Sequence, residues 1–278
     1  MEIIDFNFKL TMPGLIEEGS ASHKPNMSNY MKRYGIDDSR SHETVEDAIQ
    51  YLKDAGVTYA VIAGSDDETL RNRIVANEKI AKIRDEHSDF FKFAWAGADP
   101  HKGMQAVRQF QSDVEQLGMQ GLYMNPWYNR MFANDRRYYP LYAKAAELDV
   151  PVSLHFISSM DPTATMRYGH PSYLDDIAVD FPEVRFVARH PGFPWDKELA
   201  AVAYRQPNVF IELSAINPKL LTGLIPRVGD IVQDKVMFGS GFPWVTPERG
   251  IAWVNRLPLS DEVKQKVLFG NAANFIGL

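Results

Sequence analysis

PVSLHF at residues 151–156 and VRFVARHPGFPW at residues 184–195 are two apolar runs that each carry a histidine near the end, His155 and His190. Short apolar runs bounded by turn residues are typical of buried parallel strands. Six further runs of this kind occur along the chain. The eight strands that we predict are Ile3–Phe8, Tyr59–Ala63, Phe91–Ala96, Gly121–Met124, Val152–Phe156, Arg185–Ala188, Val209–Leu213 and Val236–Phe238. They alternate with helical patterns, which predicts an α/β fold, the (β/α)8 or TIM barrel.

The helical patterns between the runs support this alternation. Four apolar residues after Ser41 share one helix face: Val45, Ala48, Ile49 and Leu52. Gly56 is suited to end that helix, and Pro140 is suited to begin the one in YYPLYAKAAEL. Two more helices are predicted at Asp196–Tyr204 and Asp261–Phe269.

Two connections are longer than a compact barrel needs, Leu10–Arg40 after the first strand and Ile157–Tyr173 after the fifth. Loops of this length are usually active-site lids or lack regular structure. Both leave the C-terminal ends of strands, where the active sites of this fold lie. We therefore predict that they border a site.

The composition of the whole chain narrows the classes of protein. Its 278 residues, 45% of them hydrophobic, suit one barrel domain spanning 1–278. A net charge of −6 and a pI near 5.7 argue against nucleic acid as a partner. The absence of cysteine excludes disulfides and thiolate metal sites. Neither a signal peptide nor a membrane-spanning run is evident, so we predict a cytoplasmic protein that does not bind membranes.

Five segments resemble, in order, the landmarks of one enzyme family: NDRRYYPLYAKAAELDVPVSLHF, YLDDIAVDFPEVRFVARHPGFPW, QPNVFIELSA, KVMFGSGFPW and LFGNAANFIGL. The chain is similar to the amidohydrolase-related family (amidohydrolase 2), in the branch of aminocarboxymuconate semialdehyde decarboxylase and the resorcylate-type decarboxylases. The resemblance implies that His155 and His190 lie in the barrel mouth. It implies decarboxylase, hydratase or hydrolase activity.

The chain departs from the family at its metal ligands. The family's first strand usually carries His-x-His or Glu-x-His, where this chain has Asn7 and Lys9. Its last strand usually reads GSD, where this chain has GSG with Gly241. Catalytic zinc commonly takes three protein ligands, and His155 and His190 supply two. We therefore predict no tightly bound metal, with weak or partial binding of a divalent metal at the two histidines left open.

The residues at the altered ligand positions could act without a metal. A lysine ammonium can bind a carboxylate or stabilise an enolate, so we predict that Lys9 is catalytic. His155 and His190 are predicted to act as general acid or base, because imidazole titrates near neutral pH. The alternative is that Lys9 extends into solvent and that backbone groups satisfy both histidines.

Seven residues are candidates for substrate binding, because they follow strands or extend the expected mouth: Asn7, Tyr123, Asn125, Trp127, Arg130, Ser214 and Trp244. Arg130 is a candidate for a substrate carboxylate. The alternative for the aromatic residues is that they only cover the barrel top. Strand alternation next to His190 predicts that Arg189 points away from the pocket and forms a structural salt bridge.

These features predict a hydrolase or decarboxylase that cleaves a bond next to a carbonyl or carboxylate in a small acid or acyl substrate. The candidate reactions are decarboxylation of an aromatic or unsaturated acid and hydrolysis of a β-keto acyl compound or lactone. Two alternatives remain, a catalytically silent barrel that binds a small carboxylate and a metal-dependent enzyme with an unusual ligand set. A homodimer is a candidate assembly.

Overall fold

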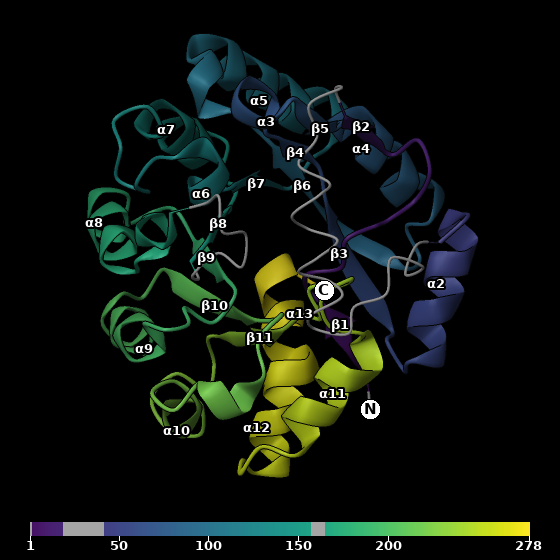
Figure 1. Ribbon diagram of the computed structural model, residues 1–278, viewed down its shortest axis with the longest axis vertical. Helices are drawn as coiled ribbons and strands as arrows, with labels where there is room; N and C mark the ends of the chain where they lie inside the picture. The colour runs from purple at the N-terminus through teal and green to yellow at the C-terminus, as the bar shows by residue number, and fades with distance from the viewer. Residues whose placement is uncertain (1, 19–41, 157–164) are drawn as a thin grey trace.

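A computed structural model of the chain describes residues 2–18, 42–156 and 165–278. Eight strands form one parallel sheet in the order β1, β3, β6, β7, β8, β9, β10, β11 (Figure 1). Their bounds are β1 Ile4–Asp5, β3 Tyr59–Ala63, β6 Phe91–Gly97, β7 Gly121–Met124, β8 Val152–His155, β9 Phe186–Arg189, β10 Val209–Leu213 and β11 Val236–Phe238. The predicted barrel is confirmed, and four strands have the predicted bounds.

Backbone contacts between the first and last strands close the ring. The Phe6 N–H donates to the Phe238 carbonyl at 2.9 Å, and the Gly241 N–H donates to the Asn7 carbonyl at 2.9 Å. The first strand is shorter than predicted, because the Asn7 N–H bonds the Asp5 carboxylate at 3.1 Å and not a neighbouring strand. This local bond turns the chain into the barrel mouth.

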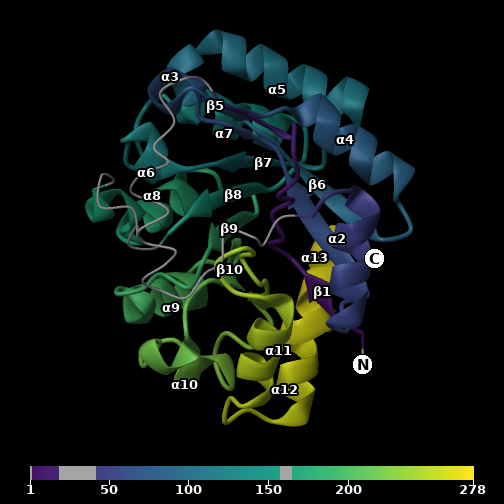
Figure 2. The same cartoon turned by 45° about the vertical axis from the view of Figure 1, so that its right-hand side comes forward.

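Helices surround the strands, as the barrel pattern requires (Figure 1). The α-helices are α2 Val45–Asp54, α3 Glu68–Arg71, α4 Asn77–Glu86, α5 Met104–Leu117, α6 Pro126–Asn129, α7 Tyr139–Glu147, α8 Ser172–Asp180, α9 Asp196–Arg205, α10 Ile225–Val228, α11 Pro247–Asn255, α12 Asp261–Gln265 and α13 Asn271–Ile276. A π-helical turn at Lys266–Gly270, η4, interrupts the last predicted helix. Three short 3₁₀ segments are η1 Pro100–Lys102, η2 Met166–Gly169 and η3 Pro218–Leu220. In Figure 2, α4 and α5 lie side by side outside the strands.

Apolar side chains fill both sides of the sheet. The larger cluster lies between strands and helices. The smaller one fills the barrel interior and includes Phe6, Trp95 and Tyr123. Phe275 of α13 packs edge-on against Phe6 at 5.5 Å and against Phe210, near the start of β10, at 5.0 Å between ring centroids. The C-terminal helix therefore closes the end of the barrel opposite the mouth.

A small antiparallel sheet accompanies the barrel and was not predicted. It consists of β2 Ile16–Glu18, β5 Arg73–Val75 and β4 Ser65–Asp66, in that order. Strands of two or three residues are too short to show a period of two. Its strand β2 lies in the first predicted long loop, whose remainder, from residue 19, lies outside the described residues. The second predicted loop includes η2 and the start of α8, and its residues 157–164 also lie outside the described part.

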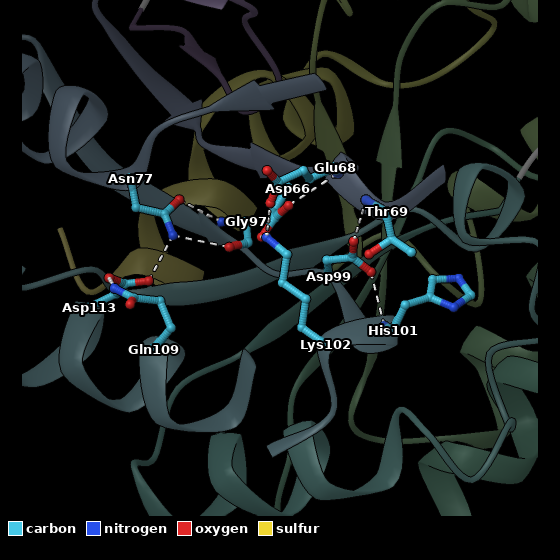
Figure 3. A network of polar contacts seen from close by, with 10 residues as sticks. All are labelled: Asp66, Glu68, Thr69, Asn77, Gly97, Asp99, His101, Lys102, Gln109 and Asp113. Atoms are coloured by element: carbon cyan, nitrogen blue, oxygen red, sulfur yellow. Dashed lines mark hydrogen bonds and ion pairs between the residues drawn. The ribbon is translucent and has the colours of Figure 1, made fainter. Parts of the chain in front are cut away.

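A polar network fixes the segment of β4, α3 and β5 to the barrel (Figure 3). The Lys102 ammonium bonds Asp66 at 2.5 Å and Glu68 at 2.7 Å. The Asp99 carboxylate accepts the Thr69 N–H at 2.9 Å. These bonds hold in place the loop that carries Asp67 and Arg73 toward the mouth.

No helix in residues 2–18, 42–156 or 165–278 is long and apolar enough to cross a membrane.

Candidate active site

His155 ends β8, is buried, and uses both ring nitrogens. The Asn125 side-chain amide donates to His155 Nδ1 at 3.1 Å, because the Asn125 carbonyl oxygen already accepts the Trp127 N–H. The other nitrogen, Nε2, therefore carries the proton and donates to the Tyr123 hydroxyl oxygen at 2.9 Å. Burial, then the positive neighbours, hold the pKa of His155 well below its usual range. This histidine is neutral and held in one orientation.

His190 follows β9 and has a different hydrogen-bond pattern. The Ser214 hydroxyl donates to Glu212 Oε2 at 2.9 Å, so its oxygen accepts the proton of His190 Nδ1 at 2.7 Å. The lone pair then lies on Nε2, for which the described residues supply no hydrogen-bond partner. Burial, followed by nearby cations, keeps the pKa of this imidazole well below its ordinary value. Its Nε2 is the free base of the cluster.

Glu212 lies behind this pair and was missed in the sequence. Its Oε2 atom accepts bonds from the Asn7 amide at 2.8 Å, from Ser214, and from the His190 N–H at 3.3 Å. Its Oε1 atom has no partner, and a Cβ on Gly239 would lie 2.2 Å from it. Burial raises the pKa of Glu212 to about 7. The available signal was an acid within the apolar run VFIEL, on the same strand face as Ser214.

Lys9 is half-buried and forms no hydrogen bond or ion pair with any residue that the structure describes. Burial, together with repulsion from Arg73 and Arg189, lowers its pKa to about 7. Lys9 in turn depresses the pKa of both His155 and His190. The ammonium therefore belongs to the electrostatics of the mouth, as its position in the sequence suggested.

The prediction for Arg189 is wrong. Its side chain is inside the barrel, on the same strand face as Val187 of the interior cluster, and only 2% of the residue is exposed. The guanidinium lies 4.2 Å from the centroid of the Tyr123 ring and forms no ion pair with a described carboxylate. Strand alternation would place Arg189 and His190 on opposite faces of β9. The backbone of His190 is left-handed, with φ +72°, and this lets the side chains of both residues face the mouth.

The rings of the cluster contact each other directly. His155 and His190 lie 4.6 Å apart between centroids, nearly perpendicular. Trp127 lies 5.0 Å from His155 and 6.5 Å from His190, stacked on the latter at 14°. The Trp127 indole N–H is buried and has no hydrogen-bond partner in the described chain. Trp127 thus forms a wall of the site and holds a free donor.

Two predicted residues lie in the segments that follow β7 and β11. Arg130 is exposed in the left-handed position that ends α6, which does not support a role in binding the substrate carboxylate. Trp244 is half-buried in the turn after β11, where its N–H donates to the Gly241 carbonyl at 3.1 Å. A role of Arg130 or Trp244 in substrate binding stays a prediction.

The residues at the family's ligand positions do not suit a catalytic metal. Asn7 is committed to Glu212 and Ser214 through its amide nitrogen. His155 has no free ring nitrogen, and Gly241 has no side chain. Within the described ranges no three His, Cys, Asp or Glu residues are placed to hold an ion. At the family's ligand positions only one imidazole nitrogen, His190 Nε2, is free, and the other groups there are the neutral amide oxygen of Asn7 and the amine of Lys9, a poor set for catalytic zinc.

The fold and this cluster of buried ionisable groups at the strand ends define a TIM-barrel enzyme. The Amidohydrolase family model (Amidohydro_2) matches residues 23–278, so the chain belongs to the amidohydrolase family, as its sequence landmarks predicted.

Other known proteins are similar to this chain in sequence or in fold. A 2-keto-4-carboxy-3-hexenedioate hydratase of Sphingobium sp. is 24% identical over 294 residues, covering 85% of this chain and 83% of the relative. An uncharacterised TIM-barrel protein of Bordetella bronchiseptica shares the fold with a TM-score of 0.81 and 23% identity, over 100% of this chain and 99% of that one. The 5-carboxyvanillate decarboxylase of Sphingomonas paucimobilis has a TM-score of 0.70 and 16% identity, with coverage of 100% and 99%.

Proposed function

We propose that the protein is a lyase, a hydratase or decarboxylase of a small unsaturated carboxylic acid, which works without a tightly bound metal. The observation that carries the proposal is the hydrogen-bonded series from Glu212 through Ser214 to His190. It orients His190 with a free Nε2 lone pair in a mouth that also holds the Lys9 ammonium. A hydratase and a decarboxylase among the similar proteins support this reaction class.

Both reactions pass through an enolate-like species, and the mouth holds one group for each requirement. In hydration, His190 Nε2 removes a proton from water as the oxygen bonds to carbon. The electron pair of the double bond then moves onto the conjugated carbonyl or carboxylate, where Lys9 stabilises the charge. His190 returns the proton to the α-carbon. In decarboxylation His190 Nε2 first takes up a proton from water; the C–C bond then breaks, CO₂ leaves, and the imidazolium gives that proton to the carbanion.

His155 acts by positioning in this proposal. Both of its ring nitrogens are occupied, so it has no lone pair for the substrate. It holds the Tyr123 hydroxyl and stands against Trp127, and these two side chains form the wall. The predicted acid or base role therefore falls on His190.

The hydrolysis of a lactone or β-keto acyl compound, the other reaction predicted from the sequence, uses the same base and cation. Turnover of a panel of unsaturated acids and lactones separates the lyase from the hydrolase. Binding without turnover of any member would instead favour a silent barrel.

The test combines metal analysis with a variant. We expect protein purified without chelator to hold less than about one equivalent of transition metal and to keep its activity after dialysis against EDTA. His190→Asn should lower kcat by about 10²–10⁴ and remove one limb of the pH profile. His87→Asn, at the end of α4, is the matched control and should be neutral. Stoichiometric zinc or manganese, with activity lost on chelation and restored by that metal, would contradict the proposal.

A further inference from the structure

We propose that the substrate is at least a dicarboxylate, and that Arg189 binds its second carboxylate. The inference rests on the proposed function, in which the first carboxylate or carbonyl group lies at Lys9. The inference follows from the Arg189 guanidinium, a cation that the fold buries without an ion-pair partner.

Arg189 lacks a counter-ion. A residue 2% exposed that carries a full charge is almost always paired in a protein interior. Here the guanidinium contacts the face of the Tyr123 ring and hydrogen-bonds the Tyr123 side chain, and it forms no ion pair with the described residues. The remaining N–H donors of the rigid fork are thus left for a ligand, and a carboxylate is the planar partner that fits them.

The nearest acid cannot serve as that partner. Glu212 lies opposite Arg189 in the register of β10 and β9, and its negative charge partly offsets the lowering of the Arg189 pKa by burial. Its Oε2 atom, however, already accepts three hydrogen bonds, from Asn7, Ser214 and the His190 backbone. Its Oε1 atom is directed at Gly239. Glu212 is therefore committed to the histidine, and the guanidinium stays available.

The two unpaired cations of the mouth, Lys9 and Arg189, favour a ligand with two negative charges. Arg73 has its own acid in Asp67, at 3.9 Å. Lys9 and Arg189 have none within ion-pair distance among the described residues, and Arg189 makes the charge on Lys9 less favourable. One carboxylate would neutralise one of these cations and leave the other buried and unpaired. Two carboxylates on one molecule neutralise both.

A second free donor supports a polar ligand here. The indole N–H of Trp127, 8% exposed, has no partner although its ring stacks on His190. Buried indole N–H groups normally find an acceptor. An oxygen of the bound acid would supply it.

The experiment compares ligands that differ by one carboxylate. Dissociation constants are measured by calorimetry for crotonate, trans-glutaconate and inorganic phosphate with the wild-type protein. They are measured again with Arg189→Met and with Arg185→Met. Arg185 is the matched control, because its guanidinium also lies over a ring, Phe275 at 4.7 Å, but at the closed end of the barrel. Thermal unfolding verifies that each variant is folded.

We expect wild-type protein and Arg185→Met to bind glutaconate about 10- to 100-fold more tightly than crotonate, as a charge-assisted bidentate pair implies. Arg189→Met should remove this preference and leave crotonate binding unchanged. Equal affinities in the wild type, a preference that survives in Arg189→Met, or phosphate binding as tight as glutaconate would each overturn the inference.

Turnover separates the two proposals. Glutaconate preference without turnover of any acid would uphold the dicarboxylate site and refute the lyase. Turnover of monocarboxylates without tighter binding of glutaconate would uphold the lyase and refute the dicarboxylate site.

Discussion

Replacing Glu212 by Gln tests whether a buried carboxylate supports the base. Gln keeps an oxygen for the bonds from Asn7 and Ser214 and removes the charge. Two hydrogen bonds in series, of 2.9 and 2.7 Å, join the carboxylate to His190 Nδ1. Opposite unit charges about 6 Å apart attract by about 3 kcal/mol at an effective dielectric constant of about 20. Because about 1.4 kcal/mol equals tenfold in rate, kcat should fall about 100-fold as the imidazolium loses this support.

The assay is steady-state turnover of the true substrate across pH. The limb that reports deprotonation of the base should move to lower pH, since the imidazolium is less stable without the anion. Asp113→Asn is the matched control, because Asp113 is also a buried acid whose pKa burial raises, but it lies in α5 outside the mouth. A kcat within twofold of the wild type, with an unmoved pH profile, would refute the role of Glu212.

The same substitution should change stability in the opposite direction. Burial raises the pKa of Glu212 from 4.5 to about 7, so the folded state holds this proton more tightly than the unfolded state does. Its contribution to the free energy of unfolding is therefore greatest below pH 4.5, falls as pH rises to about 7, and is constant above. The loss across this window is about 3 kcal/mol. Chemical denaturation at a series of pH values should show that the free energy of unfolding of Glu212→Gln lacks this decline between pH 4.5 and about 7. The same dependence of the free energy of unfolding on pH in both proteins would exclude the contribution of Glu212.

Two further predictions concern the altered ligand positions. Lys9→Met should lower kcat by about 10²–10³ with a smaller effect on KM, and should raise Tm because burial and two guanidinium groups disfavour the ammonium; near wild-type kcat/KM would make Lys9 a bystander. Gly241→Asp restores the family's acid at a backbone with φ +66°, where a Cβ would lie 3.1 Å from that of Ala215. We expect an unfolding free energy lower by about 1–2 kcal/mol and no metal-dependent activity, measured by thermal unfolding and metal titration; a metal-activated variant would show that the site needs only this ligand.

The sequence by itself determined the barrel and the neighbourhood of the site. Period and run length are local properties, so eight strands and four of the helices could be predicted from them. Thr44 caps α2 through a hydrogen bond to the Asp47 N–H, and Pro140 lies in the first turn of α7, both short-range effects. His155 and His190 reach the mouth because parallel strands present their C-terminal ends at one edge of the barrel.

The tertiary structure decided which side chains meet. Asn7 and Glu212 are 205 positions apart and share a hydrogen bond, a pairing that no local pattern contains. The orientation of Arg189 depends on one left-handed residue, His190, and the sequence alone does not reveal that φ value. Both positions are set by ring closure and side-chain packing over the whole barrel. For that reason the residues that complete the site, a buried acid and an unpaired cation, emerged only once the strands were placed side by side.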